Sequence, residues 1–217
     1  GGKELGYSSD LDIIFLYDDA DERAGEVYAR FAQRINHWLS SRTSSGILFE
    51  TDLALRPSGA SGLLVSSVEA FQRYQEENAW TWDHQALTRP RPCAGDAGDG
   101  KQFDQIREDI LKRKRNPEDL RRDICTMRDK MLGAHPNRSS LFDLKHDRGG
   151  MIDIEFAVQC LVLGHSHHHA DLTGNLGNIA LLRMAAGHGL LDAALAERGR
   201  NAYREFRRRQ HALRLNG

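Results

Sequence analysis

Residues 1–19 read GGKELGYSSDLDIIFLYDD, and the stretch DLDIIFLY within them, residues 10–17, decides the expected fold. Its side chains alternate between two faces of an extended strand. One face carries Asp10, Asp12, Ile14 and Leu16, and the other carries Leu11, Ile13, Phe15 and Tyr17. The pattern predicts a strand with two acids at its start.

Further elements follow along the chain. Residues 26–39 have helical periodicity, with an apolar stripe that we expect to pack on the sheet: Val27, Phe31, Ile35 and Trp38 or Leu39. Residues 47–55, ILFETDLAL, predict a second strand on which Glu50 and Asp52 share one face. The segments SVEAFQRYQEE and WTWDHQAL predict two helices, the first of them capped by its serine.

A change of pattern occurs at residues 90–100, PRPCAGDAGDG, whose proline and glycine content indicates a boundary. From about residue 101 the periodicity is helical throughout. We therefore expect an α+β protein in which a catalytic domain with a mixed sheet, residues 1–95, precedes an all-helical domain, residues 96–217. The chain lacks an initial methionine and ends within an apparent helix, so we expect a piece truncated at both ends.

Composition limits the functional classes. The formal net charge is −1 and the pI is about 6.9, which argues against recognition of nucleic acid or of anionic membrane by a global positive field. The three cysteines, Cys93, Cys125 and Cys160, are too scattered for a CxxC motif and too few for a disulfide framework. With no signal peptide and no apolar run of membrane-spanning length, the sequence predicts a cytoplasmic protein.

The acids on the two predicted strands indicate metal chemistry. Asp10 and Asp12 project from one strand face, with their Cα atoms roughly 7 Å apart, and Asp52 lies on a neighbouring predicted strand. Three converging carboxylates can hold two magnesium ions at about 4 Å separation, an arrangement that serves phosphoryl transfer. A DxD pattern alone is weak evidence, and a solvated strand end explains it when nothing else is known.

The context of the DxD pattern strengthens the prediction. Gly1 and Gly2 stand upstream, and Ser8 and Ser9 directly precede Asp10. Flexible glycine backbone and serine hydroxyls can approach phosphate oxygens closely. Together these residues give a nucleotidyltransferase pattern, although the glycine pair is also compatible with a plain turn.

Long blocks of the sequence resemble the glutamine synthetase adenylyltransferase family. GGKELGYSSDLDIIFLYDD resembles its active-site motif, and TSSGILFETDLALRPSGASGLLVSS resembles its third-carboxylate strand and the following loop. AWTWDHQALTRPRP is similar to its WEHQAL segment with Asp83 in place of the usual Glu, and FDLKHDRGGMIDIEFAVQCLVL resembles its helical-domain block. The resemblance covers nearly the whole chain and implies a polymerase beta-like nucleotidyltransferase core.

The resemblance also implies roles for individual residues. Asp10, Asp12 and Asp52 would be the magnesium ligands, and Asp52 would also be the base for a target tyrosine hydroxyl. The residues expected to contact the phosphates of ATP are Gly1, Gly2, Ser9 and Arg56. Arg56 could equally form a structural ion pair with Glu50 or another acid. Glu50 itself is expected in a supporting position more than as a fourth ligand.

Enzymes of this family carry one unit that adds AMP to glutamine synthetase and one that removes it by phosphorolysis. The loop RPSGASG resembles the adding unit, because the removing unit typically reads RPFG there, and Ser58 is therefore the discriminating residue. The resemblance implies transfer of AMP from ATP to a tyrosine of glutamine synthetase, with a PII-type signal protein as a second partner. The alternatives are the removing unit and a non-catalytic regulatory module of the same fold.

Two other features are less indicative of function. The tract HSHHH, residues 165–169, lacks the spacing of a tetrahedral zinc site, and an exposed helix end explains it better. Lys145, Asp153 and Glu155 flank Gly149 and Gly150 at a predicted helix start, from which they could reach the cleft between the domains, where we expect the nucleotide to bind. The expectation that these three residues reach the cleft rests on analogy of fold alone.

Overall fold

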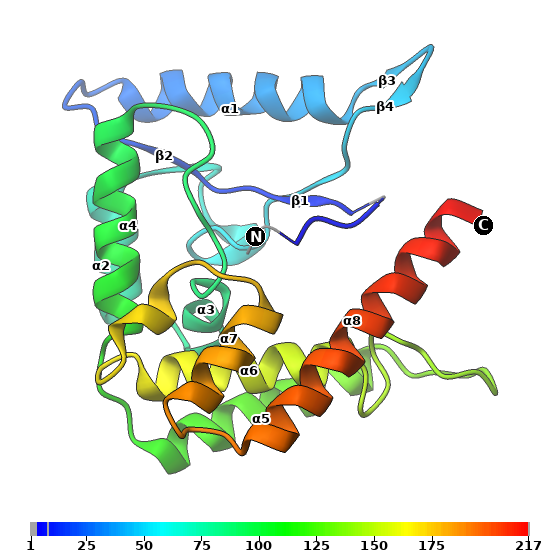
Figure 1. Ribbon diagram of the computed structural model, residues 1–217. Coiled ribbons are helices and arrows are strands. Elements are labelled where there is room, and N and C mark those ends of the chain that lie inside the picture. Colours follow the sequence, from blue (N-terminus) through cyan, green and yellow to red (C-terminus); the bar gives the residue numbers. More distant parts are fainter. Residues whose placement is uncertain (1–3, 8, 217) are drawn as a thin grey trace. The chain divides into compact units, whose positions relative to one another are not determined.

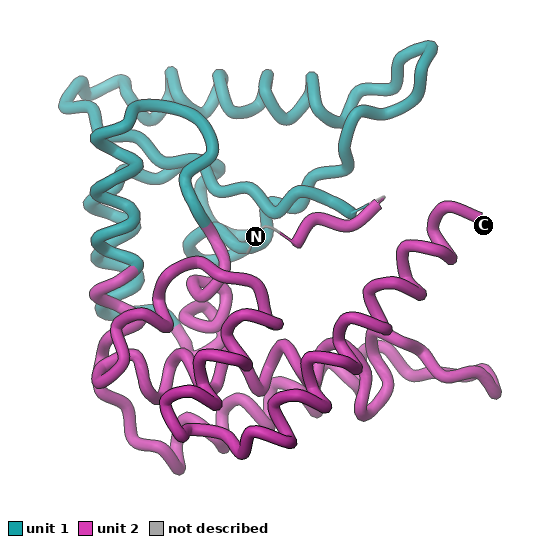
Figure 2. The backbone as a smooth tube through the Cα atoms, in the orientation of Figure 1, with its two compact units in different colours: residues 1, 8–79, 91–107 teal, residues 2–7, 80–90, 108–217 magenta. Residues whose placement is uncertain are grey.

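The computed structural model describes residues 4–7 and 9–216 and has an α+β architecture (Figure 1). The described residues form two compact units (Figure 2). The first contains residues 9–79 and 91–107 and holds all the strands. The second contains residues 4–7, 80–90 and 108–216 and is helical. The chain therefore leaves the helical unit after residue 7 and enters the strand-containing unit just before Asp10.

The strands are short and pair in three places. β1, Leu11–Asp12, pairs in parallel with β5, Thr51–Asp52, and β2, Phe15–Tyr17, pairs in parallel with β6, Val65–Ser67. β3, Arg42–Thr43, and β4, Gly46–Ile47, form an antiparallel hairpin. The expected strand over residues 10–17 is thus two strands separated at Ile13 and Ile14, and the strand expected over residues 47–55 is also divided. Parallel and antiparallel pairs both occur, but in separate two-stranded sheets.

Helix α1, Ala24–Ser40, confirms the predicted helix but not its predicted buried face. Val27, Phe31 and Trp38 are at least half exposed, at 50%, 54% and 65%. The most deeply buried residues of α1 are Ala24 and Ala32, which are 4% and 1% exposed. The helix is rotated from the expected orientation because small alanine side chains allow it to approach its neighbours closely, and large apolar residues do not mark the buried stripe here.

Two further helices complete the first unit. α2, Val68–Glu77, starts directly after β6, and the Ser67 hydroxyl accepts the Ala70 N–H at 3.1 Å, which confirms the predicted cap. α4, Ala97–Leu111, begins in this unit, and its residues 108–111 belong to the other. Phe71 of α2 and Phe103 of α4 pack with ring centroids 5.6 Å apart. This contact anchors the core behind the strands.

The regular elements of the helical unit, among the residues the structure describes, are all helices. The unit contains α3, Thr81–Ala86; α5, Pro117–Ala134; α6, Met151–His165; α7, Asn178–Gly187; and α8, Ala193–Asn216. Short 3₁₀ turns occur at Gly59–Ser61 in the first unit and at Ala170–Thr173 in the second. In the part of the chain that the structure describes, no helix is both long and apolar enough to cross a bilayer.

Sequence chemistry accounts for the way these helices begin and pack. Asn116 caps α5 by accepting the Glu118 and Asp119 N–H groups, and Pro117 occupies the first helical position, where its missing N–H is not needed. α7 packs along α8, and the core of the unit includes Leu163, Leu182 and the almost completely buried Tyr203.

Candidate active site

The parallel pairing of β1 with β5 builds the acidic site. Asp12 lies directly opposite Asp52 in the register, and the Leu11 N–H and Ile13 N–H donate to the carbonyl oxygens of Glu50 and Asp52, each at 2.9 Å. Side chains directly opposite each other on paired strands lie on the same face. Asp10, two residues before Asp12, shares that face. The alternation read from the sequence puts Asp10 and Asp12 on one face, and the pairing of β1 with β5 brings Asp52 to them.

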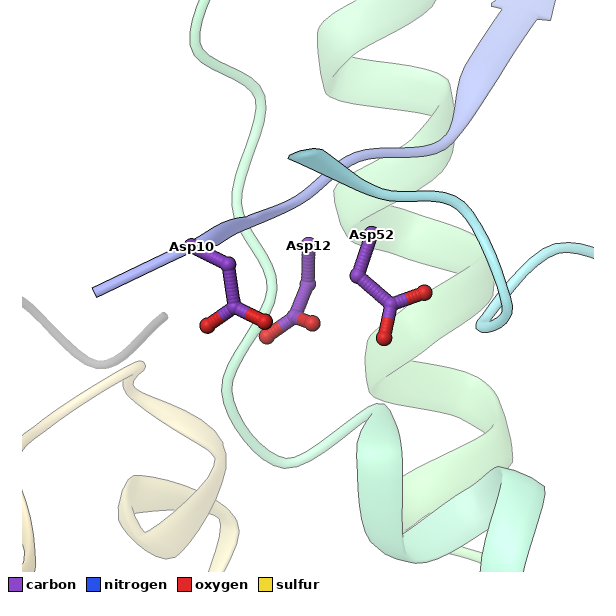
Figure 3. Close-up of side chains that lie close together, drawn as sticks. All are labelled: Asp10, Asp12 and Asp52. Carbon is purple, nitrogen blue, oxygen red and sulfur yellow. The ribbon is translucent and has the colours of Figure 1, made fainter. Parts of the chain in front are cut away.

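The three carboxylates point to the same side of the strand pair (Figure 3). One oxygen from each of Asp10, Asp12 and Asp52 lies within 4.8 Å of the others. Asp10 and Asp12 are exposed and Asp52 is partly exposed, so a charged ligand has access from solvent. Mutual repulsion of three negative charges in one place is relieved by a cation.

The donor set fits magnesium. Carboxylate oxygens are the ligands that this small, hard cation prefers, at 2.0 to 2.1 Å, and a thiolate or imidazole is not required. Two oxygens that ligate one magnesium ion lie at most about 4.2 Å apart. The observed 4.8 Å limit therefore calls for only a small closing movement of side chains on a fixed strand pair. Among the residues the structure describes, this is the one group of three or more His, Cys, Asp or Glu side chains that converges in this way.

The other predicted site residues are placed differently. Ser9 directly precedes Asp10 and is partly buried, whereas Gly1, Gly2 and Ser8 lie outside the described residues. Glu50 is exposed and does not belong to the carboxylate group; its backbone carbonyl serves the strand pairing instead.

Arg56 organises the loop that follows the third acid. Its guanidinium donates to the carbonyl oxygens of Leu53 at 2.7 Å, Ala60 at 3.1 Å and Gly62 at 3.3 Å. The five N–H donors of arginine suit this kind of loop bracing. In the part of the chain that the structure describes, Arg56 forms no ion pair with Glu50 or another acid. Its guanidinium forms these hydrogen bonds to backbone instead.

Two residues of this loop have demanding backbone positions. Ser58 adopts the left-handed conformation, with φ 61° and ψ 16°, which few residues other than glycine adopt without cost. A Cβ on Gly62 would lie 1.9 Å from the Pro57 carbonyl oxygen, so only glycine fits there. The loop is therefore a specified turn. The sequence signal was the Pro-Ser-Gly and Ser-Gly pairs, which mark turns but not their geometry.

The acids of the helical unit have structural partners within that unit. Asp153 forms an ion pair with Arg128 and accepts the Gly149 N–H, while Glu155 pairs with Arg89 at 3.4 Å and accepts the Tyr203 hydroxyl at 2.9 Å. These contacts hold helices and loops together. Sequence reasoning singled out both acids but had no means of identifying partners so far away along the chain.

Comparison with known proteins adds the chemical context. The chain is 60% identical to the bifunctional glutamine synthetase adenylyltransferase/adenylyl-removing enzyme of Aromatoleum aromaticum and 58% identical to that of Nitrosomonas europaea, in each case over all 217 residues. The enzyme of the same name from Chromobacterium violaceum is 56% identical over 216 residues. Over its whole length the chain is therefore similar to one part of enzymes that carry this name.

Two family models match different parts of the chain. The glutamate-ammonia ligase adenylyltransferase model matches residues 1–106, which include the three acids, and the GlnD PII-uridylyltransferase model matches residues 125–217. The alignments with the relatives named above include the whole chain. The chain spans only 23% to 24% of the length of those relatives.

Proposed function

We propose that this chain is a nucleotidyltransferase that transfers AMP from ATP to a tyrosine of glutamine synthetase and releases pyrophosphate. The observation that carries the proposal is the register of β1 and β5, which sets Asp12 opposite Asp52 and gathers three carboxylates in a chain whose relatives are named adenylyltransferases. The direction of the reaction rests on the loop RPSGASG, through its resemblance to the adding unit.

Asp10, Asp12 and Asp52 would hold magnesium. When bound, the metal supplies positive charge that neutralises the triphosphate and lowers the pKa of the attacking hydroxyl. The paired strands β1 and β5 would fix the positions of these ligands, because phosphoryl transfer depends mainly on positioning and charge stabilisation.

Asp52 is also the proposed base. Its Oδ1 accepts the Ala54 N–H at 2.7 Å, which fixes the carboxylate and leaves Oδ2 to take the tyrosine proton. The tyrosine oxygen forms a bond to the α-phosphorus, the bond from that phosphorus to the bridging oxygen of the β-phosphate breaks, and pyrophosphate leaves. Ser9, Gly1 and Gly2 are proposed to contact the phosphates from the segment before Asp10.

Two alternatives use the same residues. The removing unit would attack adenylyl-tyrosine with phosphate at the same carboxylates, and a regulatory module would bind without catalysis. The gathered carboxylates favour catalysis over a regulatory module, and the loop resemblance favours addition over removal. A PII-type signal protein as a partner and a cytoplasmic location both stay predictions.

The test uses ATP labelled at the α-phosphate, magnesium and unmodified glutamine synthetase, with the 217-residue chain as the enzyme. The proposal expects label on the synthetase that depends on magnesium and disappears in Asp12→Asn. Label that persists without divalent metal, or that never appears while the chain is folded, would overturn it.

A further inference from the structure

Thr51 lies directly before Asp52 on β5 but points to the opposite side of the strand. Successive side chains of a strand lie on opposite faces, so Asp52 joins the acidic face (Figure 3) while Thr51 faces α1. The Thr51 hydroxyl donates to Asn36 Oδ1 of α1 at 2.6 Å, and both residues are half-buried. One hydrogen bond thus joins the strand of the third acid to a helix that precedes it in the chain.

β5 has few other contacts that hold it in register. It consists of two residues, and among the described residues it pairs with β1 only. The N–H groups of Leu11 and Ile13 supply the hydrogen bonds on that side. A pair of short strands is marginally stable by itself and depends on packing against other elements. The face of β5 that is turned to α1 therefore matters for its position.

The same helix also holds the chain just before β5. The Phe49 N–H donates to the Leu39 carbonyl oxygen at 2.9 Å, near the end of α1, and α1 packs against β5. Asn36 and Leu39 are three residues apart and so lie on one side of the helix. A backbone hydrogen bond at residue 49 and a side-chain hydrogen bond at residue 51 together fix the strand against the helix. Of these two, the side-chain hydrogen bond can be removed by substitution.

The requirements of a cation make the exact position of β5 important. The carboxylate oxygens of the three acids lie within 4.8 Å of one another, whereas two oxygens that ligate one magnesium ion lie at most about 4.2 Å apart. A threonine hydroxyl that bonds to a helix is often no more than a satisfied polar group. Thr51, however, shares a peptide unit with Asp52, so any shift of its backbone moves the third carboxylate relative to the other two.

We propose that Asn36 and Thr51 are positioning residues for the metal site, because their hydrogen bond fixes β5 and with it the Asp52 carboxylate. The inference rests on the proposed function, which makes Asp52 a magnesium ligand. Contacts that lie behind metal ligands typically contribute about 10-fold to 100-fold to metal affinity or activity. Loss of this hydrogen bond should therefore weaken metal binding, although its two side chains lie on the face of β5 opposite to the acids.

The test removes the hydrogen bond from each side in turn. Thr51→Val keeps the branched shape and the strand preference of threonine without its hydroxyl, and Asn36→Leu removes the acceptor with little change in size. Thr51→Ser retains the hydroxyl and is the conservative variant. Thr43→Val is the matched control, because it removes a hydroxyl that donates to the Gly46 carbonyl oxygen at 2.9 Å in the β3–β4 hairpin of the same unit.

The metal itself is the probe, so one readout does not depend on activity. The Kd for Mn²⁺, which accepts the same oxygen ligands as magnesium, is measured by electron paramagnetic resonance without nucleotide, beside kcat for AMP transfer. We expect Kd to rise and kcat to fall about tenfold in both Thr51→Val and Asn36→Leu. The double variant should be no weaker than either single variant, because both changes remove the same hydrogen bond. Thr51→Ser and Thr43→Val should match wild type.

Wild-type Mn²⁺ affinity in a folded Thr51→Val variant would overturn the inference and leave the hydrogen bond as a structural contact only. Additive losses in the double variant would also overturn it, since they would show that the two side chains act separately. If Thr51→Val does not fold, Asn36→Leu decides in the same way. A wild-type chain that binds Mn²⁺ but transfers no AMP would contradict the proposed function alone, because the comparison of Mn²⁺ affinities still tests the inference. A wild-type chain that binds no Mn²⁺ would overturn both.

Discussion

At the scale of single residues, the site depends on three carboxylates whose positions are set by backbone pairing. Asp12 and Asp52 face each other across a parallel strand pair, and Asp10 follows from the two-residue period of the strand. Negative charge concentrated in this way is costly without a cation, and it serves chemistry that needs one. The charge of these side chains, more than their shape, should therefore decide activity.

Asp12→Asn is expected to lower magnesium-dependent AMP transfer by at least about 100-fold, because the amide cannot supply the charge that holds the metal. The fold should be retained, since the amide has the same size and the strand pairing uses backbone atoms. Asp18→Asn, at an exposed acid beyond the carboxylate group, is the matched control and should keep wild-type activity. Comparable activity of the two variants would show that Asp12 is not a metal ligand.

Asp52→Asn should separate binding from chemistry. The amide oxygen can still accept the Ala54 N–H, so the local turn should persist, but the side chain can no longer take the tyrosine proton. We expect kcat to fall by about 100-fold to 10,000-fold while the Kd for ATP changes by less than about threefold. Single-turnover kinetics beside ATP titration gives both numbers. Lost ATP affinity with an unchanged rate per bound ATP would contradict the role of base.

At the scale of elements, the loop after β5 is constrained by its own hydrogen bonds and close backbone contacts. Arg56 donates hydrogen bonds to three of its carbonyl oxygens, and Ser58 has a left-handed conformation. A Cβ at Gly62 would clash with the Pro57 carbonyl oxygen. The loop starts just beyond Asp52, so disorder in it would reach the third carboxylate directly. The sequence of this loop, RPSGASG, is also the feature whose resemblance to the adding unit favours addition of AMP over its removal.

Gly62→Ala is expected to disrupt this loop, because the added methyl group meets backbone atoms that cannot yield. The expected loss of unfolding free energy is about 1 to 3 kcal/mol, the usual cost of inserting a methyl group into filled space. Gly133→Ala in α5, where no atom lies within 4 Å, is the control and should be neutral or slightly stabilising. Denaturant titration of both variants gives the comparison, and a Gly62→Ala variant as stable as the control would contradict the described loop.

How far the sequence predicts the structure varies from element to element. The shared face of Asp10 and Asp12 and the Ser67 cap of α2 follow from local rules, namely strand alternation and side-chain capping, whereas the pairing that adds Asp52 is a contact between distant segments. The orientation of α1 does not, because its buried residues are the small Ala24 and Ala32, whereas most of the large apolar residues that mark the stripe in the sequence are exposed. The hydrogen bonds of Glu4 to residues 178 and 203 also leave no local signal, because most of the chain separates these residues from it.

At the scale of the whole molecule, the described chain has two compact units and is similar to enzymes roughly four times its length, since it spans 23% of the Aromatoleum relative. Those relatives are named for both addition and removal of the adenylyl group. Both directions use the same metals and the same in-line geometry. The carboxylates therefore support adenylyl transfer in either direction, and a product analysis is needed to establish which direction this chain catalyses.

Mass spectrometry of glutamine synthetase after incubation with the chain tests the central claim most directly. Unmodified synthetase with magnesium and ATP, and pre-adenylylated synthetase with magnesium and phosphate, are treated in parallel, each with wild type and with Asp12→Asn. We predict one added AMP on a single tyrosyl peptide of the unmodified synthetase, pyrophosphate as the released product, and no change with Asp12→Asn. Removal of AMP from the modified synthetase with formation of ADP, while the unmodified synthetase stays unlabelled, would contradict the proposal and identify the removing unit.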